Sequence, residues 1–332
     1  MKVLLGTALA VALMGAACEA GAAPIVSLSG SDANAGDIDL STPGSYTLWD
    51  VLGGSTTATT ATVAGGTLTT NGAVTNFTPT GDNTKNAILR DYLVITDASG
   101  QNSVVSLGEI DPQFVGSATT SPIGASSNYV LQSNGTTVTF EDLAAGASGR
   151  NLSDVTSIAL LAAAAQPGPI NPPPATNPIT LTGNVAHPGS YTLPTLESGF
   201  TPTTETVNGD TYTGVPLWDF LGANNSDVLG QYVVAVGSDG YEVVYSLAEL
   251  DPLLGGNSGD LLPYADTNGN FPSSGLARTI LPGDTPFAHG RWESNLDLVS
   301  VNEVPEPGSM ALFLSALALG AFAYRSRRYP SE

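Results

Sequence analysis

Residues Tyr92–Pro112, YLVITDASGQNSVVSLGEIDP, decide the fold of this chain because they recur later as Tyr232–Pro252, YVVAVGSDGYEVVYSLAELDP. A second block, Pro43–Leu48 with the sequence PGSYTL, returns unchanged as Pro188–Leu193. Blocks that recur at a nearly constant offset are the signature of an internal duplication. The sequence therefore predicts a unit of roughly 130 residues that is present twice.

The chain between the two copies is rich in proline. Six prolines fall between Pro167 and Pro178. Proline lacks the amide that a sheet ladder needs, so this stretch favours an extended, semi-rigid spacer over a buried edge strand. We expect five segments: a signal peptide, a diverged first repeat, a linker, a second repeat and a C-terminal sorting segment, at residues 1–22, 23–161, 162–178, 179–303 and 304–332.

Within each copy the local signals are mostly those of strands. Tyr232–Val236 and Tyr241–Tyr245 are short apolar runs on either side of the turn Gly237–Gly240, which is the pattern of a β-hairpin. The hairpin is followed by Ser246 and, three residues later, Glu249, the spacing of a helix capping box. The first copy has the same arrangement, so we expect an α+β, β-rich fold with a few short helices.

The N-terminus has the pattern of a secretory signal. Lys2 precedes the apolar run Val3–Ala17, and Ala20–Ala22 offers a cleavage site between small residues. A mature start near Ala23 follows from this pattern. The alternatives are a lipoprotein signal that ends at Cys18 and a buried N-terminal helix.

The C-terminus has a three-part order of motif, apolar run and basic cluster. The motif is Val304, Pro305, Glu306 and Pro307, the uncharged run is Gly308–Tyr324, and the cluster is Arg325, Arg327 and Arg328. A run of this length predicts a transmembrane helix whose arginines stay in the cytoplasm. The order resembles the PEP-CTERM sorting signal of Gram-negative bacteria. That resemblance implies cleavage near the motif by an exosortase and release to, or attachment at, the cell surface. The alternative is a plain membrane anchor.

The composition excludes one class of function and restricts another. The chain has 9 Lys plus Arg against 30 Asp plus Glu, a formal net charge of −21, which excludes nucleic-acid binding because phosphates need clustered cations. The single Cys18 lies in the signal. The mature body retains five cations for 27 acids, namely Lys85, Arg90, Arg150, Arg278 and Arg291.

The second copy resembles the molybdopterin-binding oxidoreductase domain of the sulfite-oxidase type. The matching pieces, in order, are Tyr212–Trp218, Gly237–Tyr241, Ser246–Pro252, Asn268–Gly269, Gly275–Arg278, Pro282–Asp284 and Gly290–Trp292. The resemblance implies two tandem sulfite-oxidase-like domains, of which the first lacks the Pro-Gly-Asp piece and the tryptophan after Arg150. It also implies a molybdenum held by a cysteine thiolate, which the mature chain cannot supply. We therefore expect no catalytic residue, no metal and no cofactor.

Arg291, Trp292 and Tyr241 are the candidate ligand contacts, since a guanidinium can stack on an indole ring. Because Gly-Arg occurs in both copies, a structural arginine is the alternative. Two acidic residues of each copy allow two interpretations. They could form an acid–base pair or a cation site, or the glutamate could serve as a helix cap; the residues are Glu249 and Asp251 with their counterparts Glu109 and Asp111. Two other readings concern single features: a calcium loop or a turn at Asp266–Asn270, and general bases or surface residues at His187 and His289.

These observations predict a secreted, surface-sorted, non-catalytic protein of the extracellular matrix that binds a polysaccharide, another ligand or a surface protein. Its processing partner would be exosortase, and its membrane contact would be the C-terminal helix before processing. Two alternatives stay open. One is a molybdopterin-type oxidoreductase or cofactor-binding protein that lacks the cysteine ligand, and the other is a calcium-dependent adhesin.

Overall fold

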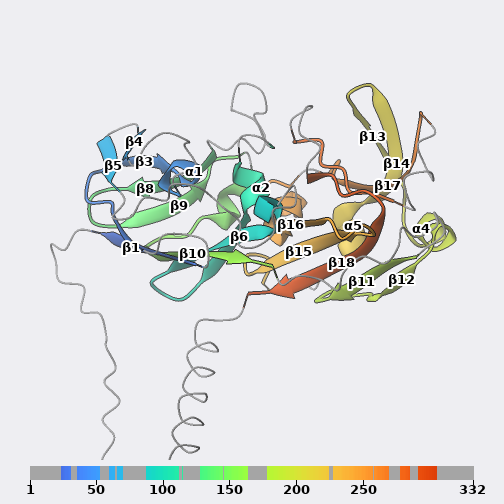
Figure 1. Cartoon of the computed structure of the whole chain (residues 1–332), viewed down its shortest axis with the longest axis horizontal. Helices are drawn as coiled ribbons and strands as arrows, with labels where there is room; N and C mark the ends of the chain where they lie inside the picture. The colour runs from blue at the N-terminus through green and yellow to red at the C-terminus, as the bar shows by residue number, and fades with distance from the viewer. Residues whose placement is uncertain are drawn as a thin grey trace, which may run out of the picture.

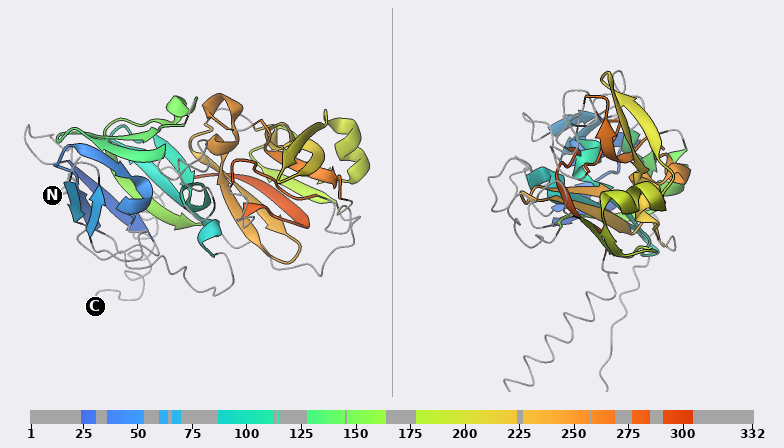
Figure 2. Two further views of the ribbon diagram at one scale, coloured as in Figure 1. Left: turned by 90° about the horizontal axis from the view of Figure 1, so that it is seen from above. Right: turned by 90° about the vertical axis from the view of Figure 1, so that its right-hand side faces the viewer.

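The fold is described from a computed structural model of the whole chain. The structure describes residues 24–30, 36–52, 60–63, 66–69, 87–111, 114, 128–144, 146–163, 178–223, 227–256, 258–268, 277–284 and 291–304. The predicted signal peptide, most of the proline-rich linker and the sorting segment after Val304 lie outside these residues. The two halves of the body lie side by side along the long axis of the molecule (Figures 1 and 2).

Each half contains one five-stranded sheet, and the two sheets have the same strand order. In the first half the order is β2-β1-β10-β6-β7, and in the second it is β12-β11-β18-β15-β16. Both sheets combine one parallel pair, β1 with β10 or β11 with β18, with antiparallel neighbours. The strands are β1 (Ile25–Gly30), β2 (Gly36–Asp39), β6 (Asp91–Asp97), β7 (Asn102–Ser106), β10 (Val155–Ala162), β11 (Ile179–Gly183), β12 (Gly189–Tyr191), β15 (Gln231–Gly237), β16 (Glu242–Ser246) and β18 (Leu296–Glu303).

Two smaller, three-stranded sheets and a hairpin complete the described strands. They lie above the five-stranded sheets in Figure 1. One sheet has the order β3-β8-β9 and the other β13-β14-β17, while β4 and β5 form the hairpin. Their bounds are β3 (Gly44–Thr47), β4 (Thr60–Val63), β5 (Gly66–Thr69), β8 (Tyr129–Ser133), β9 (Val138–Asp142), β13 (Thr203–Val207), β14 (Asp210–Pro216) and β17 (Leu261–Asp266).

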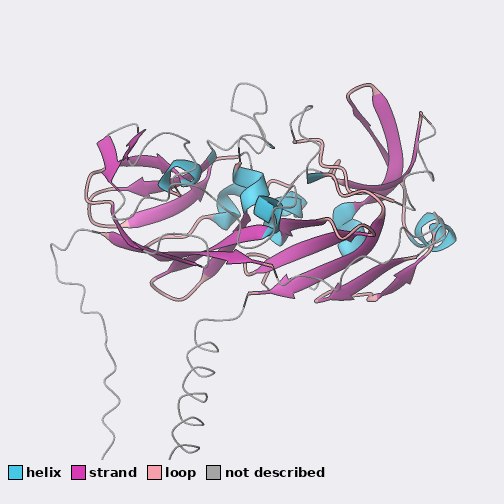
Figure 3. Cartoon of the chain, viewed as in Figure 1, coloured by secondary structure: helices cyan, strands magenta, loops and turns pink. Residues whose placement is uncertain are grey.

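The described helices are short and follow the ends of strands (Figure 3). Ser106 and Ser246 cap α2 and α6, and in each case the serine hydroxyl accepts from the N3 amide while the N3 glutamate accepts from the serine amide. The predicted capping spacing is thus present in both copies. The helices are α1 (Leu48–Val51), α2 (Leu107–Ile110), α4 (Leu193–Gly199), α5 (Leu217–Leu221) and α6 (Leu247–Leu250), with 3-10 turns η1 (Ala87–Arg90), η3 (Ala147–Arg150) and η4 (Pro252–Leu254).

The predicted fold class, α+β with two tandem sulfite-oxidase-like domains and a transmembrane helix, is wrong. The protein is β-rich, and its four sheets of three to five strands form a four-bladed, propeller-like arrangement. The short helices expected after the capping boxes are present as single turns of four residues, with their C-caps at Asp111 and Asp251, so the error lies in the arrangement of the sheets. No helix in the described part of the chain is long and apolar enough to cross a membrane. The expected helix at 308–324 lies outside those residues.

The two halves share an apolar interface. Each half has a core of its own, and a third buried cluster joins them with Tyr92, Val94 and Val104 from one half and Val234, Val236 and Val244 from the other. The rings of Tyr92 and Tyr232 stack with centroids 4.3 Å apart. The Val104 amide donates to the Leu229 carbonyl at 2.7 Å. Corresponding elements of the two copies therefore meet each other.

A glycine permits the close approach of β14 to β17. A Cβ atom at Gly214 would lie 2.3 Å from the Leu262 carbonyl oxygen and 2.3 Å from the Pro263 Cα, both backbone atoms. The register between these strands shifts at the same place, between Thr213 and Gly214. These backbone atoms are held in the paired strands, so they cannot make room for a Cβ atom in the way that the flexible end of a side chain can.

We expect Gly214→Ala to lower the free energy of unfolding by about 1–3 kcal/mol, because the methyl group overpacks the strand pair. Urea denaturation measures the change. The matched control is Gly199→Ala, where an added Cβ meets no atom within 4 Å. Equal unfolding midpoints for the two variants would contradict the close approach.

Candidate functional site

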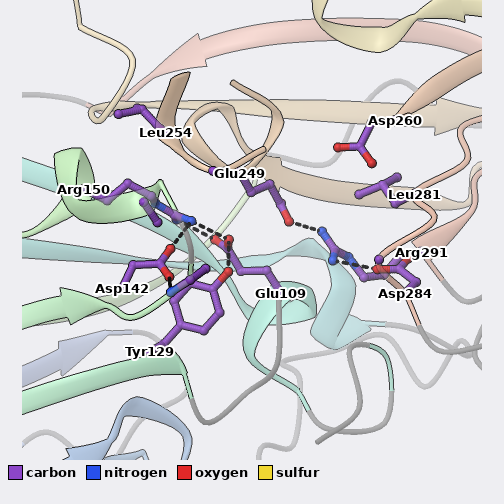
Figure 4. Close-up of a pocket in the computed structure, with 14 residues that line it drawn as sticks. Glu109, Tyr129, Asp142, Arg150, Glu249, Leu254, Asp260, Leu281, Asp284 and Arg291 are labelled. Carbon is purple, nitrogen blue, oxygen red and sulfur yellow. Dashed lines mark hydrogen bonds and ion pairs between the residues drawn. The ribbon is translucent and has the colours of Figure 1, made fainter. Parts of the chain in front are cut away.

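A pocket of about 60 Å³ lies where the two halves meet. Its walls come from α2, β8, β9 and η3 of the first half, and from α6, η4, residues 281, 283 and 284, and Arg291 of the second half. Figure 4 shows its charged residues facing one another. The lining residues are Glu109, Tyr129, Asp142, Ala144, Ala147, Arg150, Glu249, Leu254, Gly255, Asp260, Leu281, Gly283, Asp284 and Arg291.

Arg150, at the end of η3, is buried with 1% of its surface exposed and binds groups from both halves. Its two terminal nitrogens donate to the two oxygens of Glu109 at 3.1 and 3.2 Å, and Nη1 also donates to Asp142 at 3.0 Å. Nη2 donates to the Ser246 hydroxyl at 3.2 Å. Since Ser246 is the N-cap of α6, this arginine ties the first half to a helix start in the second.

Arg291 is the counterpart of Arg150 in the second half. Its Nη2 lies 2.5 Å from Glu249 and its Nη1 lies 3.1 Å from Asp284. The Ser106 hydroxyl donates to Glu249 at 3.1 Å, which is the reciprocal link from the first half to the second. The arrangement is two buried groups, each with one arginine, one capping-box glutamate and one aspartate, connected through two serines.

The local sequence explains why both glutamates point toward an arginine. As the N3 residue of a capping box, each glutamate gives one oxygen to the serine amide, at 2.6 Å for Glu109 and 2.9 Å for Glu249. That contact fixes the carboxylate, so that it also accepts from the guanidinium. Gly108 allows the approach of Arg291, because a Cβ at this position would lie 2.9 Å from its Nε.

Burial sets the protonation of the carboxyl groups. It raises the pKa of Glu249 to about 7 and that of Asp284 to about 6, although Arg291 acts in the opposite direction on both. The Glu109 charge adds to the rise at Glu249. The pKa of Asp142 is also raised by burial, against Arg150. Burial favours neutral guanidinium, but the carboxylates outweigh it and raise the pKa of both arginines, which therefore stay charged.

The pocket does not fit a molybdopterin cofactor. Both guanidiniums that line it already bind two carboxylates of this chain, whereas an anionic pyrophosphate needs open cations. Five carboxylates line the walls with only two arginines, so the field repels an anion. No cysteine occurs among the described residues to supply the thiolate.

The predicted ligand contacts are not brought together. Arg291 lines the pocket, but its guanidinium lies over the ring of Tyr245 at 5.2 Å and not over Trp292. Trp292 is buried and donates from Nε1 to the Leu281 carbonyl at 3.2 Å. Tyr241 is half-buried against the second core. The pocket walls therefore include one of the three, and a ligand role for this set stays a prediction.

The structure also places the other residues weighed from the sequence. His187 is exposed, and its carbonyl accepts from the Tyr191 hydroxyl, while His289 lies outside the described residues. At Asp266–Asn270, which the sequence left open between a turn and a calcium loop, Asn268 donates to Asp210 and Thr267 accepts from the Thr211 amide. Gly269 and Asn270 lie outside the described residues, within which no group of three or more His, Cys, Asp or Glu could hold a metal.

Of the sorting residues, only Val304 is described, and its amide donates to the Gly230 carbonyl at 2.9 Å. Pro305, Glu306, Pro307, Arg325, Arg327 and Arg328 lie outside the described residues. Sequence reasoning missed Asp142, Asp260 and Asp284 as pocket residues. One sequence signal for this site was available. A capping-box glutamate and a Gly-Arg pair both occur in each copy, and in a chain with so few cations this recurrence indicates that the arginines bind the glutamates.

Comparison with known proteins identifies the C-terminal segment. Residues 303–328 match the PEP-CTERM protein-sorting motif. This motif marks the protein for export to the cell envelope of a Gram-negative bacterium and for processing by exosortase. No curated protein matches the chain.

A distant likeness exists to solved structures that include the sulfane dehydrogenase SoxCD from Paracoccus pantotrophus. The identity is 17%, the TM-score is 0.32, and the match covers 44% of this chain and 42% of that one. The match thus spans less than half of the SoxCD chain, and a likeness this distant assigns neither an activity nor a cofactor.

We expect Arg150→Met to lower the free energy of unfolding by about 3–5 kcal/mol, because it leaves Glu109 and Asp142 buried without their cation. Urea denaturation measures the loss. Arg90→Met is the control, since the Arg90 side chain is 25% exposed and makes one ion pair, to Glu242. Adding Asp142→Asn to Arg150→Met should restore part of the stability. A loss no larger than that of the control would contradict the structural role of the cluster.

The raised pKa values predict that stability falls as the pH rises. Glu249 has a folded pKa of about 7 against 4.5 ordinarily, so between these values the folded chain holds a proton that the unfolded chain releases. Each unit of difference corresponds to about 1.4 kcal/mol. Asp284 acts in the same direction up to about pH 6, and Glu293, whose pKa burial raises to about 9, extends the decline.

Urea midpoints measured from pH 5 to pH 9 should therefore decrease. Glu249→Gln should flatten the curve between pH 5 and 7, whereas the exposed Asp37→Asn should leave its slope unchanged. A midpoint that rises with pH across this window would show that the buried carboxyl groups are not protonated in the folded state.

Proposed function

We propose that this is a non-catalytic binding protein of the extracellular matrix, whose two halves form one unit that is displayed at the cell surface. A polysaccharide, a smaller ligand or another surface protein would be bound there. The sorting motif supports the location, since it follows directly on β18, the last strand of the body. Residues 24–304 are thus the part that works outside the cytoplasm.

One observation carries the non-catalytic part of the proposal: both arginines of the pocket are already paired with carboxylates of this chain. Each arginine binds two carboxylates, and both capping-box glutamates also hold a serine amide. A catalytic acid, base or anion-stabilising cation must be able to reach a substrate, and these side chains are at most 8% exposed. The cluster supports a structural role in joining the halves.

Processing of the sorting segment is tested on protein recovered from the cell surface. Mass spectrometry should find a mature C-terminus near residues 304–308, because the motif begins there. The same spectra from cells that lack exosortase serve as the control and should retain the tail. Peptides covering Arg325 to Glu332 in the mature surface form would contradict processing.

The non-catalytic role is tested by elemental and pterin analysis of the purified protein. We expect molybdenum and pterin far below one equivalent per chain, since the pocket offers neither a thiolate nor an open cation to such a cofactor. Stoichiometric molybdenum would overturn the proposal in favour of an oxidoreductase without the cysteine ligand. An unfolding temperature raised by millimolar calcium would favour an adhesin instead.

A further inference from the structure

Two tyrosines meet where the two halves of the chain join. The rings of Tyr92 and Tyr232 stack with their centroids 4.3 Å apart and their planes 23° from parallel. They occupy corresponding positions of the two copies, namely the second residue of β6 and the second residue of β15. Among the ring pairs in the described part of the chain, this is the one that joins two tyrosines. The contact therefore links each copy to its counterpart through the same chemical group.

The main chain of both tyrosines is fixed. Tyr92 pairs with residues of β7 and β10, and Tyr232 pairs with residues of β16 and β18. Both residues thus lie on interior strands that have a paired neighbour on either side. Two groups that a rigid scaffold holds in contact react with each other as though each were present at a very high concentration. A reaction between these rings can proceed by movement of the side chains alone.

The hydroxyl groups of the two tyrosines also interact. Burial raises the pKa of the Tyr92 hydroxyl, and Tyr232 adds to the rise through its charge and through a hydrogen bond between the two side chains. With the ring centres stacked and the hydroxyls joined at one end, the ring carbons next to the hydroxyl-bearing carbons face the opposite ring. These ortho carbons are the positions at which two oxidised phenols combine.

The surroundings of the pair do not call for hydroxyl groups. The buried cluster between the halves is otherwise aliphatic around the rings, with side chains such as Val94, Val104 and Val234. Tyr92 is 4% exposed, and Tyr232 is half-buried. Two phenylalanines would stack in the same way without placing polar groups in this cluster, where burial of a polar group costs free energy. The choice of tyrosine on both sides therefore points to phenol chemistry.

The mature body has no cysteine with which to form a disulfide between the halves. The single Cys18 lies in the predicted signal peptide. The sorting motif marks the chain for export to the cell envelope, outside the reducing cytoplasm. A covalent link between the halves in that environment needs another pair of oxidisable side chains, and the two stacked tyrosines provide one.

We propose that Tyr92 and Tyr232 are a site of oxidative modification, at which a carbon–carbon bond between ortho carbons of the two rings joins the halves covalently. The oxidant is hydrogen peroxide, used by a peroxidase. The inference goes beyond the proposed function, because the cross-link requires no bound ligand.

The reaction removes two electrons and two protons. The peroxidase takes one electron and one proton from Tyr232, which is the more exposed ring. Tyr92 then passes an electron, and its hydroxyl proton along the hydrogen bond, to the Tyr232 radical, and a second oxidation of Tyr232 leaves a radical on each ring. The radicals combine in the carbon–carbon bond, and the hydrogen on each newly bonded carbon moves as a proton to the oxygen of its own ring. One hydrogen peroxide accepts the two electrons and two protons and becomes two water molecules.

The experiment treats the purified full-length chain, in dilute solution, with a haem peroxidase and hydrogen peroxide. Trypsin cleaves after Arg90, Arg150 and Arg278, so the two tyrosines lie in separate peptides. We expect dityrosine fluorescence and a cross-linked pair of these peptides whose mass is their sum less two hydrogens. The urea midpoint of the treated chain should rise, because a link between distant residues restricts the unfolded state as a disulfide does.

Tyrosine-to-phenylalanine variants separate this chemistry from packing. Tyr92→Phe and Tyr232→Phe keep the stacked rings and remove one hydroxyl, so each should abolish the cross-linked peptide pair and the rise in urea midpoint on treatment. Tyr191→Phe is the matched control, since Tyr191 is also half-buried and its ring neighbours are Phe200 and Phe220. This variant should cross-link like the unchanged protein.

Several outcomes would overturn this assignment. They are the absence of the cross-linked pair from the treated unchanged protein, links formed mainly between different chains, and a pair that persists in Tyr92→Phe. Links spread over Tyr191 and other tyrosines would show unselective oxidation. If one phenylalanine variant does not fold, the other variant and the identity of the peptides from the unchanged protein decide. Failure here leaves the tests of the mature C-terminus and of molybdenum untouched, so it removes the cross-link and not the proposed function.

Discussion

The buried contact of Arg150 with Glu109, Asp142 and the Ser246 hydroxyl is the constraint on which the structure depends. Removing a guanidinium from water is costly, and only well-placed acceptors offset that cost. One of those acceptors belongs to the other half of the chain. The reciprocal bond from Ser106 to Glu249 repeats the dependence in the opposite direction. Each arginine is paired with two carboxylates of its own half, and a serine hydroxyl from one half contacts the cluster of the other, so both halves are needed for all of these contacts to form.

The cluster also accounts for the protonation of the protein. Two guanidiniums cannot neutralise five carboxyl groups in one small pocket, and the positive charge that would balance the excess is scarce in this chain. Burial raises the pKa of Glu249 to about 7 and that of Asp284 to about 6. Because these carboxyl groups then retain protons below those pH values, the excess of negative charge in the pocket is reduced. The contacts that join the two halves are therefore sensitive to pH as a consequence of their composition.

The sequence predicted those parts of the structure that depend on neighbouring residues. The hairpin Gln231–Gly237 with Glu242–Ser246 and the capping boxes at Ser106 and Ser246 follow from local patterns, and they are present. The fold class was wrong because the arrangement of the sheets depends on contacts between segments far apart in the chain, which a local pattern does not contain. The role of Asp142 was out of reach for another reason. The first copy lacks the Pro-Gly-Asp piece that holds Asp284, yet an aspartate at the end of β9 makes the same contact to its arginine. Contacts between halves cannot be read from a local pattern at all.

The position of the sorting motif has a mechanical consequence. Strand β18 has neighbours on both sides in its sheet, pairing with β11 and β15, and it ends at Glu303. The amide of Val304 still bonds to the Gly230 carbonyl, so the folded body extends to the first residue of the motif. Cleavage near the motif leaves every described strand intact, because all of them precede it. It also requires the processing enzyme to reach within a few residues of a paired strand, since a residue spans only about 3.3–3.6 Å when extended. A C-terminus made near the motif would therefore lie within a few residues of the end of an interior strand.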